Sequence, residues 1–468
     1  MLLDPASLTS PPLFGAAHIR AIDHAWAIAH PTAPLMPRAG AAAADLAATL
    51  ARDTGECVLV LAGPGNNGGD ALVAARQLRL RGFAVTVASR ADPFYLPPDA
   101  AQAWAAWQAD GGAVLADLPP GRRFGLIVDG LFGVGLQRPI EGDAACWIAA
   151  VNAMDGVVLA LDVPSGLDAD SGAVRGCAVR ADHTLTFLGL KPGLLTAEGP
   201  DHAGTLHLDM LGAEAMLPAT PGIALTQLES RHGLPPRRRN CHKGLFGHVG
   251  VIGGAPGMVG ACLIAGRAAL AQGAGSVTVA ALDERLAVDY GEPRLMLATP
   301  EQLVAASPDV LAIGPGLGQT TRAHALLTAA LGSPGALLLD ADALNLLAAD
   351  PDLAQRAAGR TSPTLLTPHP GEAARLLGVS GTDIQENRIN AALRLAAQFH
   401  ALVALKGAGT VIARPDGRYA INTSGGPWLA QAGSGDRLAG MAAALVAQGL
   451  SAVDALEAAV WLHGLAPA

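Results

Sequence analysis

The sequence has little charge and few aromatic side chains. Of its 468 residues, 15% are charged and 4% are aromatic, and the formal net charge is −9. Such an acidic chain lacks the basic surface that coats DNA or RNA, so we exclude nucleic acid as a partner. The five cysteines include no C-x-x-C pair, which indicates a reducing compartment and argues against structural zinc.

Targeting and membrane signals are also lacking. The N-terminal stretch MLLDPASLTSPP has no positive region followed by an apolar run, so it does not resemble a signal peptide. The longest apolar stretch, residues 438–453, is short for a membrane span and is interrupted by Gln448 and Ser451. We expect a soluble, cytoplasmic protein without a membrane partner, and we expect it to form a homo-oligomer.

The chain does contain a repeated alternation of short β-branched runs and helical patterns, over a length sufficient for two or three domains. This alternation is typical of parallel sheets and predicts an α/β fold in each half. Helical patterns are clearest at 41–51 and 71–81. The expected strands are 57–61, 84–88, 126–128, 157–161 and 184–187, then 249–252, 277–280, 310–313, 337–339, 364–366, 403–405 and 410–413.

A proline-rich stretch, residues 217–239, separates the two halves and ends in three arginines. Arg237–Arg239 could be a nucleic-acid arm, but in an acidic chain a solvated linker is the better interpretation. We therefore predict one domain at 1–216, a linker at 217–239 and a second domain at 240–468.

A glycine-rich segment, Gly63-Pro-Gly-Asn-Asn-Gly-Gly-Asp70, directly follows the first expected strand. It contains G-x-G-x-x-G, and Arg90 near the end of the next strand would suit a 2′-phosphate, so an NAD(P)-dependent dehydrogenase is one interpretation. The middle positions are Asn66 and Asn67, whose amides suit a hard cation or a phosphate. We favour that role over the alternative that both side chains only satisfy turn backbone.

Two further strand ends carry acidic and hydroxyl side chains. Asp129 precedes the loop Gly-Leu-Phe-Gly-Val-Gly, and Asp162 and Ser165 lie in Asp-Val-Pro-Ser-Gly-Leu-Asp. Each residue alone could be a helix cap or a turn residue. Ligands of open parallel sheets bind beyond the carboxyl ends of the strands, so the three loops together predict one crevice.

The segments GPGNNGGD, VDGLFGVGL and LDVPSGLD, supported by IRAIDHAW, LMPRAG and TFLGLKPGLL, resemble the NAD(P)H-hydrate epimerase family over roughly residues 12–215. The resemblance implies a Rossmann-like domain, hydrated NADH or NADPH as substrate, and a K⁺ ion held by Asn67, Asp129 and Ser165. A nicotinamide nucleotide would then be a damaged substrate and no redox cofactor. Ala71 departs from the family's usual glycine. The implied substrate contacts are Asn66, Asn67, Gly68, Gly69, Asp70, Gly133, Val134, Gly135, Leu136, Gln137, Arg138, Pro139 and Asp162.

The chemistry of this substrate calls for an acid–base residue. Hydrated NAD(P)H carries a hydroxyl on the ring carbon next to a nitrogen, which makes it a hemiaminal. Inverting that carbon requires loss and return of the hydroxyl, or ring opening and reclosure. Either route needs proton transfer and stabilisation of transient charge, and Asp162 is our candidate acid–base residue.

In the second half, Gly433-Ser-Gly-Asp436 precedes an apolar helix. Free backbone N–H groups at a helix start favour an anion. Asp436 could take a proton from a hydroxyl while those N–H groups stabilise a transferring phosphoryl group. A plain helix cap is the weaker interpretation. The absence of a G-x-x-x-x-G-K-[ST] segment excludes a P-loop enzyme.

Together with HKGLFGHVGVIGG, AIGPGLG, LLDADALN, LTPHPGE and LKGAGTVI, this segment resembles the ribokinase-like NAD(P)H-hydrate dehydratase family from about residue 240 onward. The resemblance implies phosphorylation of the substrate's 6-hydroxyl by ADP or ATP with Mg²⁺, followed by elimination of phosphate, with Asp436 as the base. Ala261, Gly316, His369 and Asp436 would line the substrate pocket. The adenine nucleotide would be held by Lys406, Gly407, Ala408, Gly409, Thr410 and Gly435.

Two departures from this family bear on the rate of transfer and on the choice of nucleotide. Trp428 follows Gly425-Gly426-Pro427 where Gly-Asn-Pro-Gly is usual, and Arg437 replaces a small apolar residue. Family members also usually extend further beyond His463-Gly464. The sequence does not decide whether ADP or ATP is the phosphoryl donor.

The favoured interpretation is a bifunctional repair enzyme, in which the front half interconverts the R and S hydrates and the rear half dehydrates the S form. One alternative is a ribokinase-like kinase of a small alcohol. Another is a non-catalytic scaffold that uses the front half. The presence of Asp129, Asp162 and Ser165 argues against it.

Overall fold

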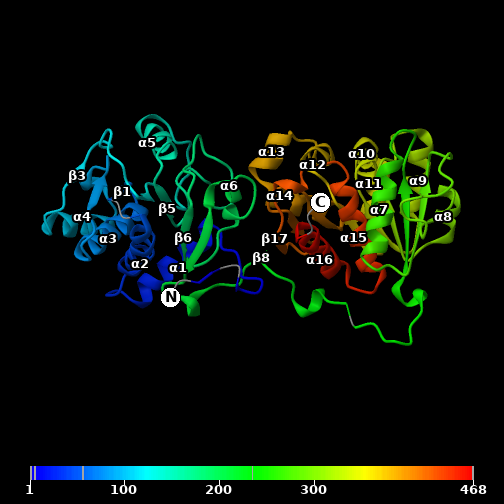
Figure 1. Ribbon diagram of the computed structural model, residues 1–468, viewed down its shortest axis with the longest axis horizontal. Coiled ribbons are helices and arrows are strands. Elements are labelled where there is room, and N and C mark those ends of the chain that lie inside the picture. The colour runs from blue at the N-terminus through cyan, green and yellow to red at the C-terminus, as the bar shows by residue number, and fades with distance from the viewer. Residues whose placement is uncertain (1–2, 5–6, 55–56, 235, 466–468) are drawn as a thin grey trace. The chain divides into compact units, whose positions relative to one another are not determined.

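The computed structural model describes residues 3–4, 7–54, 57–234 and 236–465. The chain forms two compact units, Met1–Gly222 and Ile223–Ala468, and each contains one sheet covered by helices (Figure 1). The prediction of an α/β fold in each half is confirmed.

The sheet of the first unit has seven strands, all parallel, in the order β3-β2-β1-β4-β5-β6-β7. The order reverses between β1 and β4, so the loops that follow these two strands diverge and open a crevice at their carboxyl ends. The strands are β1 (Val58–Ala62), β2 (Val85–Ala88), β3 (Val114–Leu115), β4 (Leu126–Gly130), β5 (Val157–Leu161), β6 (His183–Phe187) and β7 (Thr205–Asp209).

Helices cover both faces of this sheet, and strand β1 shows why. Its side chains alternate between two apolar clusters: Val58 and Val60 pack with residues of α1 to α4, whereas Leu59 and Leu61 pack with residues of α5. The helices are α1 (Ala16–Ala29), α2 (Met36–Thr54), α3 (Asn66–Leu80), α4 (Pro98–Ala109), α5 (Gly142–Asn152) and the short α6 (Gly199–Ala203).

The sheet of the second unit has ten strands in the order β11-β10-β9-β12-β13-β14-β15-β16-β17-β8. It is parallel from β11 to β15, and β16 and β17 continue it antiparallel. The strands are β8 (Gly222–Leu225), β9 (His248–Gly253), β10 (Ser276–Ala281), β11 (Met296–Leu297), β12 (Val310–Ile313), β13 (Ala336–Leu339), β14 (Thr364–Leu366), β15 (Leu402–Leu405), β16 (Val411–Ala413) and β17 (Tyr419–Asn422).

Alanine and glycine let the central helices of this unit approach one another closely. Helix α15 packs on α7 and α16, and at Gly440 a side chain would collide with the backbone of Ala265 in α7. The helices are α7 (Val259–Ala271), α8 (Pro300–Ala306), α9 (Thr321–Leu331), α10 (Asp342–Ala349), α11 (Pro351–Ala358), α12 (Pro370–Leu377), α13 (Gly381–Glu386), α14 (Arg388–Phe399), α15 (Ser434–Ala447) and α16 (Ala452–Leu465).

The segment 217–239, expected to be a solvated linker, is structured in part. Strand β8 is an edge of the ten-stranded sheet, where Leu225 accepts hydrogen bonds from the backbone N–H and the hydroxyl of Thr423. His232 is buried, and Arg237 stacks on the ring of Phe246 at 3.7 Å. Within the described part of this segment, these residues belong to the packing of the second unit.

Among the described residues, no helix is both long and apolar enough to cross a membrane.

Candidate functional site

A cavity of about 900 Å³ lies at the carboxyl ends of the strands in the first unit. The loops after β1, β4 and β5 line it, as the sequence predicted. Helices α1 and α2 line it as well. The predicted contacts that line it are Asn66, Asn67, Asp70, Gly133, Val134, Gly135, Leu136, Gln137, Arg138 and Asp162. Gly68, Gly69 and Pro139 are not among the lining residues.

The asparagine pair belongs to a helix and not to a tight loop. Helix α3 begins at Asn66, with Gly65 as its N-cap, so Asn67 lies in its first turn. Gly68 and Gly69 serve close packing, because a Cβ at these positions would meet the backbone of Gly63 and the side chain of Met36.

Asn67 is the buried polar group of this cavity that lacks a protein partner. Its side chain is 8% exposed, and neither Oδ1 nor Nδ2 has a hydrogen-bond partner. A Cβ at Gly133 would lie 3.4 Å from Asn67 Cγ and 3.3 Å from Asp162 Oδ2, so the space between the two side chains is about one small atom wide. A buried amide without a partner is costly, so a ligand at this point would satisfy it.

Asp129 and Ser165 form a fully buried pair below the cavity. The Ser165 hydroxyl donates to Asp129 Oδ1 at 2.6 Å, and the Ser165 backbone N–H donates to Asp129 Oδ2 at 2.8 Å. The hydroxyl also accepts from the Phe132 N–H at 2.8 Å. Burial raises the pKa of Asp129, and the bonds from Ser165 and Leu131 oppose that shift.

Asp162 is held by a lysine that the sequence analysis did not single out. Lys191 is fully buried, and its ammonium donates to Asp162 Oδ1, to the Thr186 hydroxyl at 2.9 Å and to the Phe187 carbonyl at 2.6 Å. Asp162 itself has a φ of +66°, in the left-handed region that non-glycine residues rarely adopt. Backbone strain of this kind gathers at functional sites, where the surrounding contacts hold it in place.

Asp70 brings a further carboxyl group to the cavity, beside Asp23 of α1 and Asp99 of α4. Burial, and then the negative charges of Asp162, Asp23 and Asp99, raise the pKa of Asp70 well above its usual value. The cavity therefore contains one carboxylate paired with a lysine and another whose pKa is raised by burial and by its acidic neighbours.

In the second unit, Asp436 lies in the first turn of α15, whose N-cap Gly433 has a φ of +85°. The carboxyl ends of β13 and β15 supply its charged neighbours, Asp340 and Lys406, which form a pair at 2.8 Å. A Cβ at Gly435 would lie 3.1 Å from Lys406 Nζ, so the lysine reaches the helix N-terminus.

This grouping shifts the ionisation of its members. Burial and then the charge of Asp340 raise the pKa of Asp436 to about 6, while Lys406 opposes the shift. Burial alone would lower the pKa of Lys406, but Asp340, Glu372 and Asp436 raise it above its usual value. An aspartate tuned toward neutral pH beside a fixed cation and free helix N–H groups suits proton removal next to an anion.

Of the other predicted residues of the second half, Ala261 lies in the first turn of α7, and the rest lie on loops that follow its strands. His369 caps α12 and accepts from the Gly371 N–H at 2.9 Å; burial lowers its pKa. Gly316 and Ala261 are neighbours, because a Cβ on the glycine would lie 3.3 Å from that of the alanine. The loop of Gly407, Ala408, Gly409 and Thr410 joins β15 to β16, and the Thr410 hydroxyl donates to the Gly407 carbonyl at 3.2 Å.

Arg90 does not reach the cavity of the first unit. It pairs with Asp117 and Asp143 on the surface, and these carboxylates raise its pKa. The interpretation of Arg90 as a contact to a 2′-phosphate was therefore wrong.

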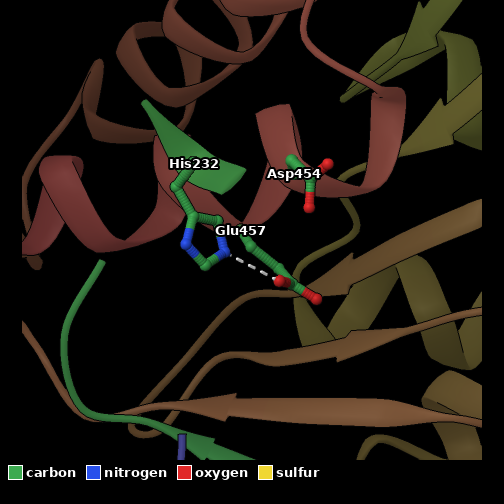
Figure 2. Close-up of side chains that lie close together, drawn as sticks. All are labelled: His232, Asp454 and Glu457. Carbon is green, nitrogen blue, oxygen red and sulfur yellow. Dashed lines mark hydrogen bonds and ion pairs between the residues drawn. The ribbon is translucent and has the colours of Figure 1, made fainter. Parts of the chain in front are cut away.

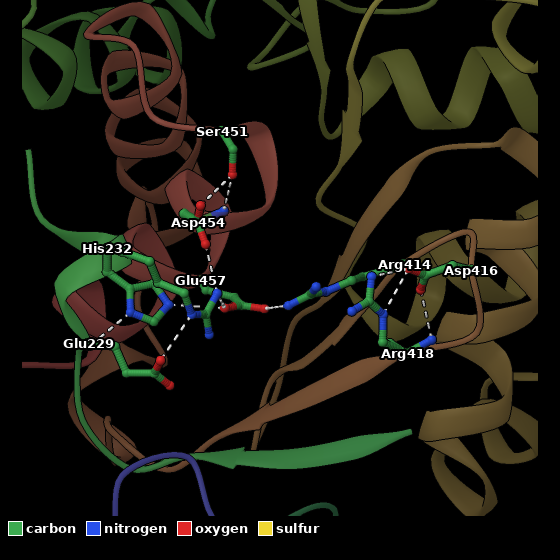
Figure 3. Close-up of polar contacts among 9 residues, drawn as sticks. Glu229, His232, Arg414, Asp416, Arg418, Ser451, Asp454 and Glu457 are labelled. Atoms are coloured by element: carbon green, nitrogen blue, oxygen red, sulfur yellow. Dashed lines mark hydrogen bonds and ion pairs between the residues drawn. The ribbon is translucent and has the colours of Figure 1, made fainter. Parts of the chain in front are cut away.

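A separate polar cluster in the second unit has the ligand types of a metal site. His232, Asp454 and Glu457 could offer atoms within 4.8 Å of one another (Figure 2). However, Glu457 already pairs with Arg231 at 2.7 Å and Arg414 at 2.5 Å, and Arg231 also pairs with Asp454 (Figure 3). Two guanidinium groups would repel a cation, so this cluster is a buried ion network that ties residues 229–232 to α16.

Comparison with known proteins identifies the family. The model described as YjeF-related protein N-terminus matches residues 32–193, and the model described as NAD(P)H-hydrate dehydratase matches residues 249–468. The bifunctional NAD(P)H-hydrate repair enzyme Nnr of Escherichia coli (strain K12) is 40% identical over 440 residues, which are 92% of this chain and 84% of that protein. The chain belongs to the bifunctional NAD(P)H-hydrate repair enzymes.

Other members are similarly related. The enzyme of the same name from Coxiella burnetii is 41% identical over 445 residues, covering 92% of this chain and 89% of that protein. A solved Bacillus subtilis structure, an ADP/ATP-dependent NAD(P)H-hydrate dehydratase co-crystallised with ATP/Mg²⁺, is 32% identical, with a TM-score of 0.44, and covers 50% of this chain and 84% of that chain. This NAD(P)H-hydrate repair enzyme thus combines epimerase and dehydratase activities, as the sequence motifs implied.

Proposed function

We propose that the cavity of the first unit is the epimerase site and that the Asp436 grouping is the dehydratase site. The observation that carries the first assignment is the cavity shared by Asn67, Gly133 and Asp162 at the reversal of the strand order. The second rests on Asp436 at the start of α15, beside the Lys406–Asp340 pair. We assign the epimerase domain to residues 1–216 and the dehydratase domain to residues 240–468 together with β8 and residues 229–232, which pack with it.

In the epimerase site, Asp162 would exchange a proton with the hemiaminal of the hydrated nucleotide. Its carboxylate lines the cavity and is held in direction by Lys191. The backbone between Gly133 and Pro139, with Asn66 to Asp70, would border the substrate. The space beside Gly133 admits a ligand atom only because that residue has no side chain.

K⁺ would bind at the edge of this cavity, where Asn67 lines it and the buried Asp129–Ser165 pair does not. The unpartnered Oδ1 of Asn67 and the oxygens of Asp129 and Ser165 are hard donors of the type that such a cation prefers. When bound, the ion would supply a fixed positive charge close to the substrate. Removing potassium should then lower epimerase activity without affecting dehydration.

In the dehydratase site, Asp436 would take the proton of the 6-hydroxyl, whose oxygen then attacks the terminal phosphoryl group of ADP or ATP. Lys406 and the N–H groups at the start of α15 would stabilise the transferring charge, and Mg²⁺ would accompany the nucleotide. The nucleotide would lie along Lys406–Thr410 and Gly435, and the substrate along Ala261, Gly316 and His369. Breaking the C–O bond then releases phosphate and restores NAD(P)H.

We further propose a cytoplasmic, homo-oligomeric enzyme. All five cysteines are free thiols, which fits a reducing compartment. Exposed apolar side chains such as Phe94 and Tyr95 are available for contact between copies. Light scattering of the purified protein tests the oligomer.

A single incubation tests both assignments. The protein is mixed with both hydrate epimers, ADP or ATP, Mg²⁺ and potassium, and NADH is followed by its absorbance. Conversion of the whole mixture supports both sites, conversion of the S form alone rejects the epimerase site, and no conversion rejects the dehydratase site.

A further inference from the structure

The epimerase cavity contains two carboxyl groups that come from different elements and have different surroundings. Asp162 comes from the end of β5, and Asp70 comes from α3, one helical turn after Asn67. Residues three apart share a helix face, and Asn67 and Asp70 both line the cavity that Asp162 lines. A substrate in this cavity would thus meet acid–base groups from two different walls.

Lys191 fixes the position of the Asp162 carboxylate. The ammonium has three N–H donors, and the structure gives it three acceptors: the Asp162 carboxylate, the Thr186 hydroxyl and the Phe187 carbonyl. All three protons are therefore used, and a fully buried cation needs the negative charge of Asp162. Lys191 is thus a positioning residue that cannot itself reach the substrate.

The surroundings of Asp70 act in the opposite direction. The charged groups that line the cavity with it are the carboxyls of Asp23, Asp99 and Asp162 and the cations Arg20 and Arg138. The three acidic neighbours, added to burial, raise the pKa of Asp70 well above its usual value. Two carboxyl groups in one cavity, one held by a cation and the other surrounded by acidic groups, can divide acid and base roles between them.

We propose that Asp70 and Asp162 form an acid–base pair for epimerisation, with Asp70 as the proton donor and Asp162, held by Lys191, as the acceptor. This inference rests on the epimerase function proposed above. An epimerisation needs this division, because the hydroxyl must leave one face of the ring carbon and return to the other.

The step balances without any reagent other than water. Asp70 gives its proton to the hydroxyl oxygen, the C–O bond breaks, water leaves with the bonding electrons, and the ring nitrogen's lone pair forms a C=N bond. Water then adds to the other face, its proton goes to Asp162, and the C=N electrons return to nitrogen. Proton exchange with water in the cavity restores both carboxyls.

The test measures kcat and KM for epimerisation of the pure R hydrate against pH, by chromatographic separation of the two epimers. In the wild type we expect the rate to fall on the alkaline side of the profile, where Asp70 loses the proton that it donates. Asp70→Asn should lower kcat by about 100-fold or more, because an amide does not deliver the proton, and should abolish the alkaline side. Asp45→Asn, on an exposed pair with Arg81, is the matched control.

Lys191→Met gives the second arm. Without the ammonium, Asp162 loses the donor that fixes its direction, so kcat for epimerisation should fall while KM and dehydration of the S hydrate persist; thermal melting monitors folding. An unchanged kcat in Lys191→Met overturns the role of Lys191, and near wild-type kcat with a retained alkaline side in Asp70→Asn overturns the role of Asp70. A wild type that does not epimerise would instead reject the proposed function.

Discussion

At the scale of single residues, Asp436 links burial to reactivity. As a base it must be ionised, and its raised pKa of about 6 means that it binds a proton as the pH falls through that value. The dehydration rate should therefore decline below about pH 6 and level off above it. Stopped assays of NADH formation between pH 5 and 8 check this; a rate independent of pH would contradict Asp436 as the base.

Replacing Asp436 removes the base altogether. Asp436→Asn should lower dehydration by about 100-fold or more, the usual worth of a positioned base. Epimer exchange, measured on the R hydrate, should persist because it takes place in the other unit. Simultaneous loss of both activities, in protein with an unchanged melting temperature, would argue against separate sites.

Lys406 acts on the pKa of Asp436. Its charge opposes the upward shift in the pKa of Asp436, so Lys406→Met should move the acid decline in rate to higher pH. Lys243→Met, in an exposed turn of the same unit, is the matched control and should leave the decline in place. An unmoved decline in Lys406→Met would mean that the two groups are not coupled.

At the scale of elements, the loop after β4 controls access to Asn67 and Asp162. A Cβ at Gly133 would enter the space between them, so Gly133→Ala should raise the epimerase KM by about ten-fold, equivalent to roughly 1.4 kcal/mol. At Gly135 in the same loop a Cβ would meet nothing within 4 Å, so Gly135→Ala should cost less. Titration of the R hydrate compares the two, and equal losses would contradict the steric argument.

The ion network around Glu457 stabilises α16. His232, Arg414 and Arg231 lower the pKa of Glu457 to about 2 despite its burial, so its contribution to stability is present above its unfolded pKa and is lost as the pH falls toward 2. Glu457→Gln leaves the partly buried Arg414 without its carboxylate partner, whereas Arg231 keeps Glu229 and Asp454, and it should lower the free energy of unfolding by about 3 kcal/mol.

Denaturant unfolding near neutral pH measures this effect. Arg418→Ala removes only an exposed pair with Asp416 and serves as control, with an expected cost of about 0–1 kcal/mol. Equal costs for the two variants would show that burial does not determine the strength of the network.

The sequence predicted those elements whose signal is local. Strands such as β12 and β14 were found with correct ends because their apolar runs are buried on both faces. Strands β3, β7, β8, β11 and β17 were missed, because a short strand at or near a sheet edge depends on its partner rather than on its own pattern. Helix α3 begins five residues before the predicted 71–81, since its first turn is built from asparagines and glycines that normally indicate a turn.

The residues of the candidate site also differ in whether their signal is local in the sequence. Asn67, Asp129, Asp162 and Asp436 were singled out because they stand at strand or helix ends, which sequence patterns reveal. Lys191 lies 29 positions from Asp162, and the two follow the neighbouring strands β6 and β5; Asp340 lies 66 positions from Lys406, and the two follow β13 and β15, which flank β14. Both pairings therefore arise only in the folded sheets, although Lys191 and Asp340 lie in segments already quoted for the family resemblance.

At the scale of the whole molecule, each activity has its own sheet and its own charged centre. Asp162→Asn should therefore leave the S hydrate fully convertible while the R hydrate accumulates, provided that both domains stay folded. Chromatography of a mixed-epimer reaction at its end point checks this. Consumption of both epimers at wild-type rates would mean that Asp162 has no part in epimerisation.

The position of β8 has a practical consequence for anyone dividing the protein. A dehydratase fragment that starts at Asn240 would lose both this strand and the Arg231–His232 anchor, and would leave the backbone of β17 unpaired along one side. Bare strand edges recruit other chains, so such a fragment is expected to precipitate or self-associate. A fragment that begins before Gly222 would keep β8 paired with β17 and should stay soluble.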